Sequence, residues 1–91
     1  MTTQPDFTVS VGGAFKEDGV WVIDTAVTYR EGLSAERRQA LLGEVRVALL
    51  KGIAREGARG RALGARRAHV LLDHGLRNDL GPVAPKRDLA L

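Results

Sequence analysis

The 91-residue sequence contains no cysteine, which excludes disulfide bonds, thiolate metal sites and cysteine nucleophiles. No apolar run approaches the roughly 20 residues that a membrane-spanning helix needs. The first ten residues, "MTTQPDFTVS", also lack the basic and apolar segments of a signal peptide. We therefore expect a protein of the cytoplasm, or of a particle assembled in the cytoplasm, with no membrane partner.

Histidine and serine are scarce, with two residues of each. His69 and His74 are five positions apart and have no further ligands at metal-site spacing. Ser10 and Ser34 have no paired base. The glycines between residues 57 and 64 lack the preceding strand and the following Lys-Ser/Thr pair of a nucleotide-binding loop. We predict no catalytic, metal-binding or cofactor-binding residues and no small-molecule substrate, so we do not expect an enzyme.

What the sequence does contain begins with two runs of alternating apolar and polar residues, at about 6–16 and 20–30. Alternation with a period of two on both sides of "EDG" predicts an antiparallel hairpin. A three-residue loop, Glu17–Gly19, keeps the apolar positions on one face and sets Phe15 opposite Trp21. All four aromatic residues fall on that face. We assign the face to the core rather than to base stacking, because the hairpin is net acidic.

A long helix is predicted at about 34–56, with Ser34 as its N-cap and Gly57 at its end. Its main apolar arc, which we expect to cover the hairpin, consists of Leu41, Leu42, Val45, Ala48, Leu49 and Ile53. Five apolar residues do not fit this core: Val47, Leu50 and Ala54 on the helix, and Val20 and Val22 on the outward face of the hairpin. Apolar surface left over on two sides of a small domain predicts self-association, most commonly as a two-fold dimer.

The segment at about 62–74 fits two structures. Its alanine, leucine and arginine content and the pair His69 and Asp73 at i,i+4 favour a second helix. The run "AHVLLD" instead fits a third strand, which would support a hairpin that is marginal alone. We prefer the helix and leave the strand open. The fold class is α+β: one small domain over residues 1–81, followed by an extended tail at 82–91 that contains two prolines.

Charge is divided unevenly along the chain. Residues 1–33 carry two basic groups and five acids, a net of −3, whereas residues 34–91 carry twelve basic groups and six acids, a net of +6. The segment "REGARGRALGARR" contains five arginines: Arg55, Arg59, Arg61, Arg66 and Arg67. These arginines fit contacts with nucleic-acid phosphates. They equally fit contacts with acids of a neighbouring subunit, such as Asp6, or a solvated hinge between two packed helices.

The order of hairpin, helix and basic segment, with the stretches "DGVWVID" and "RGR", resembles actinobacterial nucleoid-bridging proteins. The separate DNA-binding domain of that family has no counterpart here, and we do not assign the chain to it. Our leading hypothesis is a non-catalytic structural or adaptor protein that acts as a homo-oligomer, for example in a bacterial or phage particle. The alternative is a basic nucleic-acid-binding protein that contacts phosphates through residues 55–67. A second alternative is an antitoxin or inhibitor that binds a protein partner.

Overall fold

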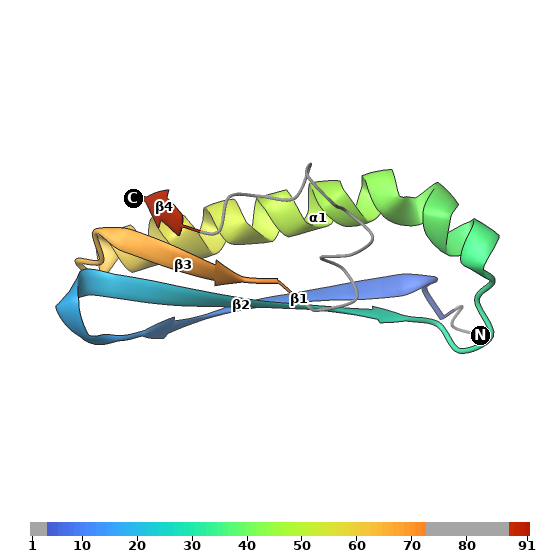
Figure 1. Cartoon of the computed structure of the whole chain (residues 1–91), viewed down its shortest axis with the longest axis horizontal. Coiled ribbons are helices and arrows are strands. Elements are labelled where there is room, and N and C mark those ends of the chain that lie inside the picture. The colour runs from blue at the N-terminus through green and yellow to red at the C-terminus, as the bar shows by residue number, and fades with distance from the viewer. Residues whose placement is uncertain (1–3, 73–87) are drawn as a thin grey trace.

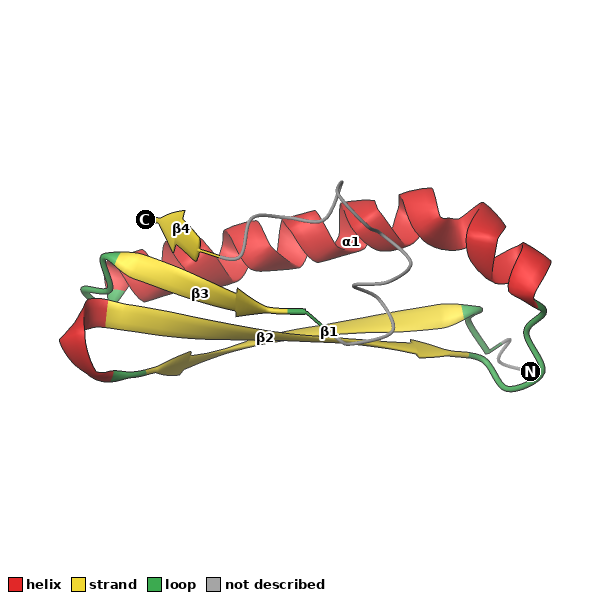
Figure 2. Cartoon of the chain, in the orientation of Figure 1, coloured by secondary structure: helices red, strands yellow, loops and turns green. Residues whose placement is uncertain are grey.

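A computed structural model describes residues 4–72 and 88–91 of the chain. The elements are, in order, β1 (Phe7–Phe15), the 3-10 turn η1 (Glu17–Gly19), β2 (Val20–Tyr29), α1 (Ala35–Ala62), β3 (Arg67–Leu71) and β4 (Asp88–Ala90). The strands form one sheet in the order β1-β2-β3-β4, and α1 lies along one of its faces (Figure 1, Figure 2). The predicted α+β class is confirmed. Within the described residues, no helix is long and apolar enough to span a membrane.

The hairpin has the register that the alternation predicts. All nine residues of β1 pair with β2, Phe15 lies opposite Trp21, and the connection is the three-residue Glu17–Gly19. Asp18 and Gly19 both have positive φ, at 64° and 74°. Glycine adopts this left-handed region without strain, which suits it to the last position of the turn. The register therefore follows the face that must be buried.

The start of α1 is also as predicted. Ser34 is the N-cap, and its Oγ accepts a hydrogen bond from the backbone N–H of Arg37 at 3.1 Å. This bond satisfies one of the amide groups that have no partner in the first turn of a helix. The buried side of the helix then follows the predicted arc, with Leu41, Val45 and Leu49 each less than 5% exposed.

The predicted helix end at Gly57 is wrong, because α1 continues to Ala62. Gly57 and Gly60 do not terminate the helix but allow it to approach its neighbours closely. A Cβ at residue 60 would lie 2.7 Å from the indole ring of Trp21, a separation that side chains do not tolerate. Because residues 55–62 belong to α1, the interpretation of the basic segment as a hinge between two helices is wrong as well.

The preferred second helix at about 62–74 is wrong, and the strand that the sequence left open is confirmed as β3. β3 runs parallel to β2. Its burial alternates with a period of two, with Ala68 and Val70 buried between more exposed neighbours. The helix propensity of alanine and leucine is outweighed because a third strand stabilises a sheet that would otherwise have only two. Residues 73–74 lie outside the described residues.

The C-terminal residues form the fourth strand. Of the predicted tail at 82–91, the structure describes residues 88–91, and 82–87 lie outside the described residues. β4 pairs antiparallel with β3. The backbone N–H of Leu91 also donates to the carbonyl oxygen of Arg66 at 3.1 Å. The last residues are therefore part of the sheet and not a free arm.

Two clusters of buried side chains hold α1 on the sheet. The first half of α1 packs on β1 and β2 through Leu41, Val45 and Leu49. The second half packs on β2 and β3, with Ile53 contacting a cluster that contains Trp21 and Val70. The helix therefore moves away from β1 along its length, and the end of β1 is left uncovered. As a result Phe15 is 55% exposed although Trp21 is 3% exposed, so the prediction that Phe15 is buried is wrong.

Candidate functional site

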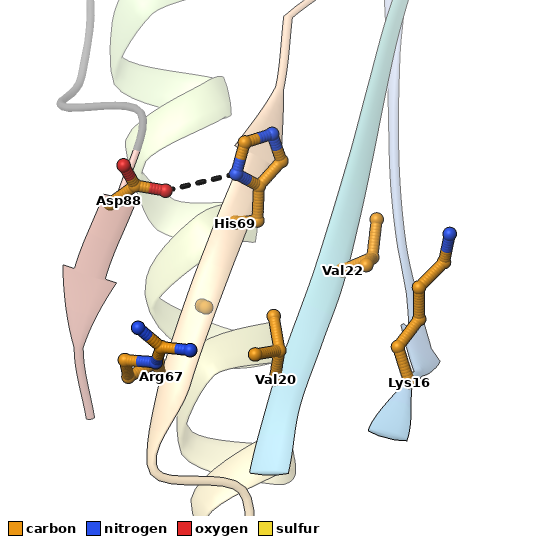
Figure 3. Close-up of a pocket in the computed structure, with 7 residues that line it drawn as sticks. Lys16, Val20, Val22, Arg67, His69 and Asp88 are labelled. Carbon is orange, nitrogen blue, oxygen red and sulfur yellow. Dashed lines mark hydrogen bonds and ion pairs between the residues drawn. The ribbon is translucent and has the colours of Figure 1, made fainter. Parts of the chain in front are cut away.

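The face of the sheet opposite α1 carries a groove of about 450 Å³ (Figure 3). In the parallel register of β2 and β3, Val20 lies opposite Arg67 and Val22 lies opposite His69. The two valines form an apolar floor, with the polar side chains of β3 on one side and Lys16 on the other (Figure 3). Both predicted interface residues of the hairpin, Val20 and Val22, are partly accessible and line one site.

His69 is fixed in the groove by a contact with Asp88 across the β3–β4 pair. Its Nδ1 lies 2.9 Å from Oδ1 of Asp88. Because an ionised carboxylate only accepts hydrogen bonds, Nδ1 carries the hydrogen and donates it. The expected helical pair of His69 with Asp73 does not apply, since His69 is on a strand and Asp73 lies outside the described residues. Within residues 4–72 and 88–91, no three potential metal ligands come together.

The five candidate arginines are distributed over three parts of the structure. Arg55, Arg59 and Arg61 are exposed on the last turns of α1, Arg66 lies in the connection that follows, and Arg67 is the first residue of β3. Nη1 of Arg59 lies 3.8 Å from Oε2 of Glu56. Only Arg67 of the five lines the groove of Figure 3. The structure therefore does not bring the five side chains together at that site.

The predicted interface residues of the helix lie on the side of α1 that faces away from the sheet. Val47 is 52% exposed and Leu50 is 42% exposed, and Ala54 is also exposed. A hollow of about 520 Å³ beside them is lined by Ala40, Gly43, Glu44, Val47, Ala48 and Lys51. A Cβ at Gly43 would have no atom within 4 Å, so this position is open. The predicted oligomer interface thus consists of two separate surfaces, one on each side of the molecule.

Asp6 joins the beginnings of β1 and α1 to the end of β2. Its Oδ1 lies 3.1 Å from Nη2 of Arg30, and its Oδ2 lies 3.1 Å from Nη2 of Arg37. The hydrogen bond from Arg37, more than the contribution of Arg30, lowers the pKa of Asp6 below its ordinary value. Asp6, one of the acids considered as partners for a neighbouring subunit, is therefore engaged within its own chain.

The sequence did not reveal how tightly Trp21 is held. A Cβ at Gly13 would overlap the indole ring from one side, and a Cβ at Gly60 would overlap it from the other. The only sequence signal was a glycine inside a strand, which often marks a close approach. Glu56 was also missed: it is 8% exposed, and its Oε2 has no hydrogen-bond partner within the described residues. In the sequence it was only the single acid of a basic segment.

The chain was also compared with known proteins, and no protein-family model, curated protein or solved structure matches it. The resemblance to nucleoid-bridging proteins therefore has no support beyond the two short stretches that suggested it.

Proposed function

We propose that this protein is a non-catalytic assembly or adaptor protein that works as a homo-oligomer. The observation that supports this most directly is the second apolar side of α1. A helix at the surface of a small domain normally has one apolar stripe, which faces the core. α1 has that stripe and, in addition, Val47 and Leu50 exposed on its opposite side. Exposed apolar side chains that cluster on one helix mark a contact surface.

The spacing of this second side fits a contact with another helix. The exposed row consists of Ala40, Gly43, Val47, Leu50 and Ala54. The steps between its members alternate between three and four residues, which is the spacing of helices that pack side by side. The small residues at both ends of the row let a second helix approach closely, while Val47 and Leu50 supply the apolar area at its centre. Two copies of α1 related by a two-fold axis would bury this row on both subunits.

A nucleic-acid-binding function competes with this proposal, because Lys16 and Arg67 both line the groove on the open face of the sheet. The same groove contains Asp88, whose side chain is 82% exposed. A carboxylate at this position repels a phosphate and weakens the attraction of the two cations. The mixed charge of the groove therefore favours a protein contact over a polyphosphate.

Light scattering of wild-type protein and of Leu50→Glu tests the proposal. The wild type is expected to have a mass of at least twice the 9.8 kDa of the chain. Leu50→Glu should lower the average mass and leave the far-ultraviolet circular dichroism unchanged, because Leu50 lies outside the core. Ala35→Glu is the control: it adds the same charge to an exposed position of α1 that lies outside the exposed row. A wild type that stays monomeric at millimolar concentration contradicts the proposal.

Titration with duplex DNA separates the two functions. If the groove contacts phosphates, the affinity should fall steeply as salt rises. Lys16→Glu combined with Arg67→Glu should then abolish the binding. We expect the wild type to show no salt-dependent DNA binding. Tight, salt-dependent binding by the wild type that is lost in the double variant would instead favour the nucleic-acid function.

A further inference from the structure

The outer edge of β1 is a second contact surface, and we infer that two copies of the chain pair along it. In this arrangement the two β1 strands run antiparallel, and Val11 lies at the two-fold axis. The inference rests on the proposed self-association and names one of its contacts. It follows from the direction of the main-chain hydrogen bonds, from the composition of β1 and from the position of Phe15.

The hydrogen bonds of the hairpin show which residues of β1 have backbone N–H and C=O groups that point away from β2. At one end the N–H of Lys16 donates to the carbonyl of Val20 at 2.9 Å, and at the other the N–H of Arg30 donates to the carbonyl of Asp6 at 2.8 Å. Asp6 and Lys16, the even-numbered residues that flank β1, are therefore hydrogen-bonded across the hairpin, and the unbroken register extends this pattern to the even-numbered residues of β1. In an antiparallel pair, hydrogen-bonded positions alternate with positions whose N–H and C=O point away. The residues whose backbone N–H and C=O groups point away from β2 are therefore Phe7, Val9, Val11, Gly13 and Phe15.

Within the described residues, no strand pairs with this edge, since β1 is the first strand of the sheet order. Natural proteins protect an edge strand with charged residues, proline, a bulge or a short length. β1 has none of these: it is nine residues long, "FTVSVGGAF", with no charge, no proline and an unbroken register. The opposite edge contrasts with it, because β4 has three residues and carries Asp88. Among the described strands, the edge at β4 is protected and the edge at β1 has no partner.

Pairing about Val11 uses the whole strand. Val9 then lies opposite Gly13 of the second copy, and Phe7 lies opposite Phe15. This register explains why an aromatic side chain that is 55% exposed in the single chain stands at the end of an edge strand. Phe15 would be covered by Phe7 of the second copy, and cross-strand aromatic pairs stabilise a sheet. Any other register shortens the overlap and leaves this pair unmade.

The remaining side chains of β1 also permit the contact. The positions on the open face of the sheet are Thr8, Ser10, Gly12 and Ala14, which are small, uncharged and exposed. On the other face, α1 lies over β1 from its start to Gly52, which packs against Val11, and over β2 and β3 beyond that point. In an antiparallel pair, the part of one α1 that lies over β1 faces the part of the other α1 that lies over β2 and β3. The two helices therefore share one face of an eight-stranded sheet without occupying the same space.

This contact is independent of the exposed row of α1. Each subunit then has two isologous contacts, one through β1 and one through α1. Contacts through β1 and through α1 that alternate from subunit to subunit build a closed tetramer if the two two-fold axes return to the first subunit. They build an open filament if the axes do not. In this arrangement Leu50→Glu reduces the assembly to the β1 dimer and not to a single chain.

Disulfide trapping in the full chain tests the pairing, because the wild type has no cysteine. Ser10 of one copy lies opposite Gly12 of the other in a pair that is not hydrogen-bonded, with Cα atoms about 4.5 Å apart, a separation that a disulfide spans. Ser10→Cys and Gly12→Cys proteins are mixed in urea, refolded together and oxidised. A Cβ at Gly12 has no atom within 4 Å, so both substitutions are compatible with the fold. Circular dichroism of each variant checks this.

The mixture should give at least about fivefold more linked dimer than either protein alone, because two copies of the same position are about 7–8 Å apart. Ser10→Cys mixed with Ala14→Cys is the control. In this register Ser10 lies diagonally from Ala14 of the second copy, at the same distance of about 7–8 Å as two copies of one position. Stronger linkage in the control mixture would show a different register and overturn the axis at Val11. An oligomeric wild type without any pair-specific linkage would overturn the edge contact and leave the proposed function standing. A monomeric wild type would overturn both.

Discussion

Replacing Gly60 by alanine should destabilise the protein, although the same change at Gly43 should stabilise it. Both residues are inside α1, where alanine is favoured over glycine by about 0.8–1 kcal/mol. Within a single chain a Cβ at Gly43 has no atom within 4 Å, so this gain is retained in full in a Leu50→Glu background, where the exposed row of α1 has no partner. At Gly60 a Cβ would lie 2.7 Å from Cγ of Trp21 and 2.9 Å from its Cδ2. The two variants therefore differ only in what the new methyl group meets.

The indole of Trp21 cannot move away from residue 60. The atoms in conflict are at the root of the ring and not at its far end, and Gly13 holds the ring from the other side. Forcing a methyl group into a packed site costs about 1–3 kcal/mol. Subtracting the helix-propensity gain leaves Gly60→Ala about 1 kcal/mol less stable than the wild type. The difference from Gly43→Ala should be about 2 kcal/mol.

Urea unfolding of both variants in the Leu50→Glu background, at one fixed protein concentration, measures this difference. Trp21 is the only tryptophan, so its fluorescence reports on the packed site directly. The midpoint should shift down for Gly60→Ala and up for Gly43→Ala, with unchanged slopes. Midpoints that shift in the same direction would refute this expectation, because the close approach of α1 to Trp21 would then have no energetic consequence.

Two further substitutions test contacts at the beginning of the fold. The pKa of Asp6 is lowered from its ordinary value of 3.8 in the folded state, so its contribution to stability is present above that value and is lost as the pH falls through the lower folded pKa. Asp6→Asn should therefore lower the thermal unfolding midpoint at pH 7. The midpoints of the wild type and the variant should converge in acid. Equal midpoints at pH 7 in low salt would contradict this. Ser34→Ala removes the N-cap of α1 and should cost about 1 kcal/mol in urea unfolding, whereas Ser34→Thr should cost less. Equal losses in both Ser34 variants would show that the cap does not contribute.

The hairpin could be predicted from the sequence because its signal is local. Side chains alternate between the two faces of a strand, so the positions of Phe15 and Trp21 fix the loop length and the register together. The burial of Phe15 could not be predicted in the same way. It depends on the path of α1 across the sheet, which is set by contacts between residues that are distant in the sequence.

The end of α1 and the identity of β3 were predicted wrongly for a related reason. Gly57 and Gly60 have the sequence pattern of a helix end, but Trp21 requires glycine at residue 60 for close packing. The segment of β3 has high helix propensity, and only the free edge of β2 makes it a strand. β4 contributes three residues, too few for a periodic pattern to be recognised.

The candidate surfaces were found in part. The periodicity of α1 predicted that Val47 and Leu50 lie outside the core, and both are exposed. The alternation of the hairpin likewise placed Val20 and Val22 away from the helix. The groove itself could not be predicted, because it needs the parallel register that sets Arg67 beside Val20. The five arginines appeared as one cluster in the sequence, but they belong to a helix, a connection and a strand, and only Arg67 of the five lines the groove.

The parallel pairing of β2 with β3 also has a kinetic consequence. The segment between Val20 and Arg67 contains the whole of α1, so a long loop must close before any contact in this pair stabilises the chain. The hairpin, whose paired residues are close in sequence, can form early. We expect β3 to dock late, on the native side of the folding barrier. Weakening β3 should therefore accelerate unfolding more than it slows folding, and the lifetime of the folded state should depend on these five residues.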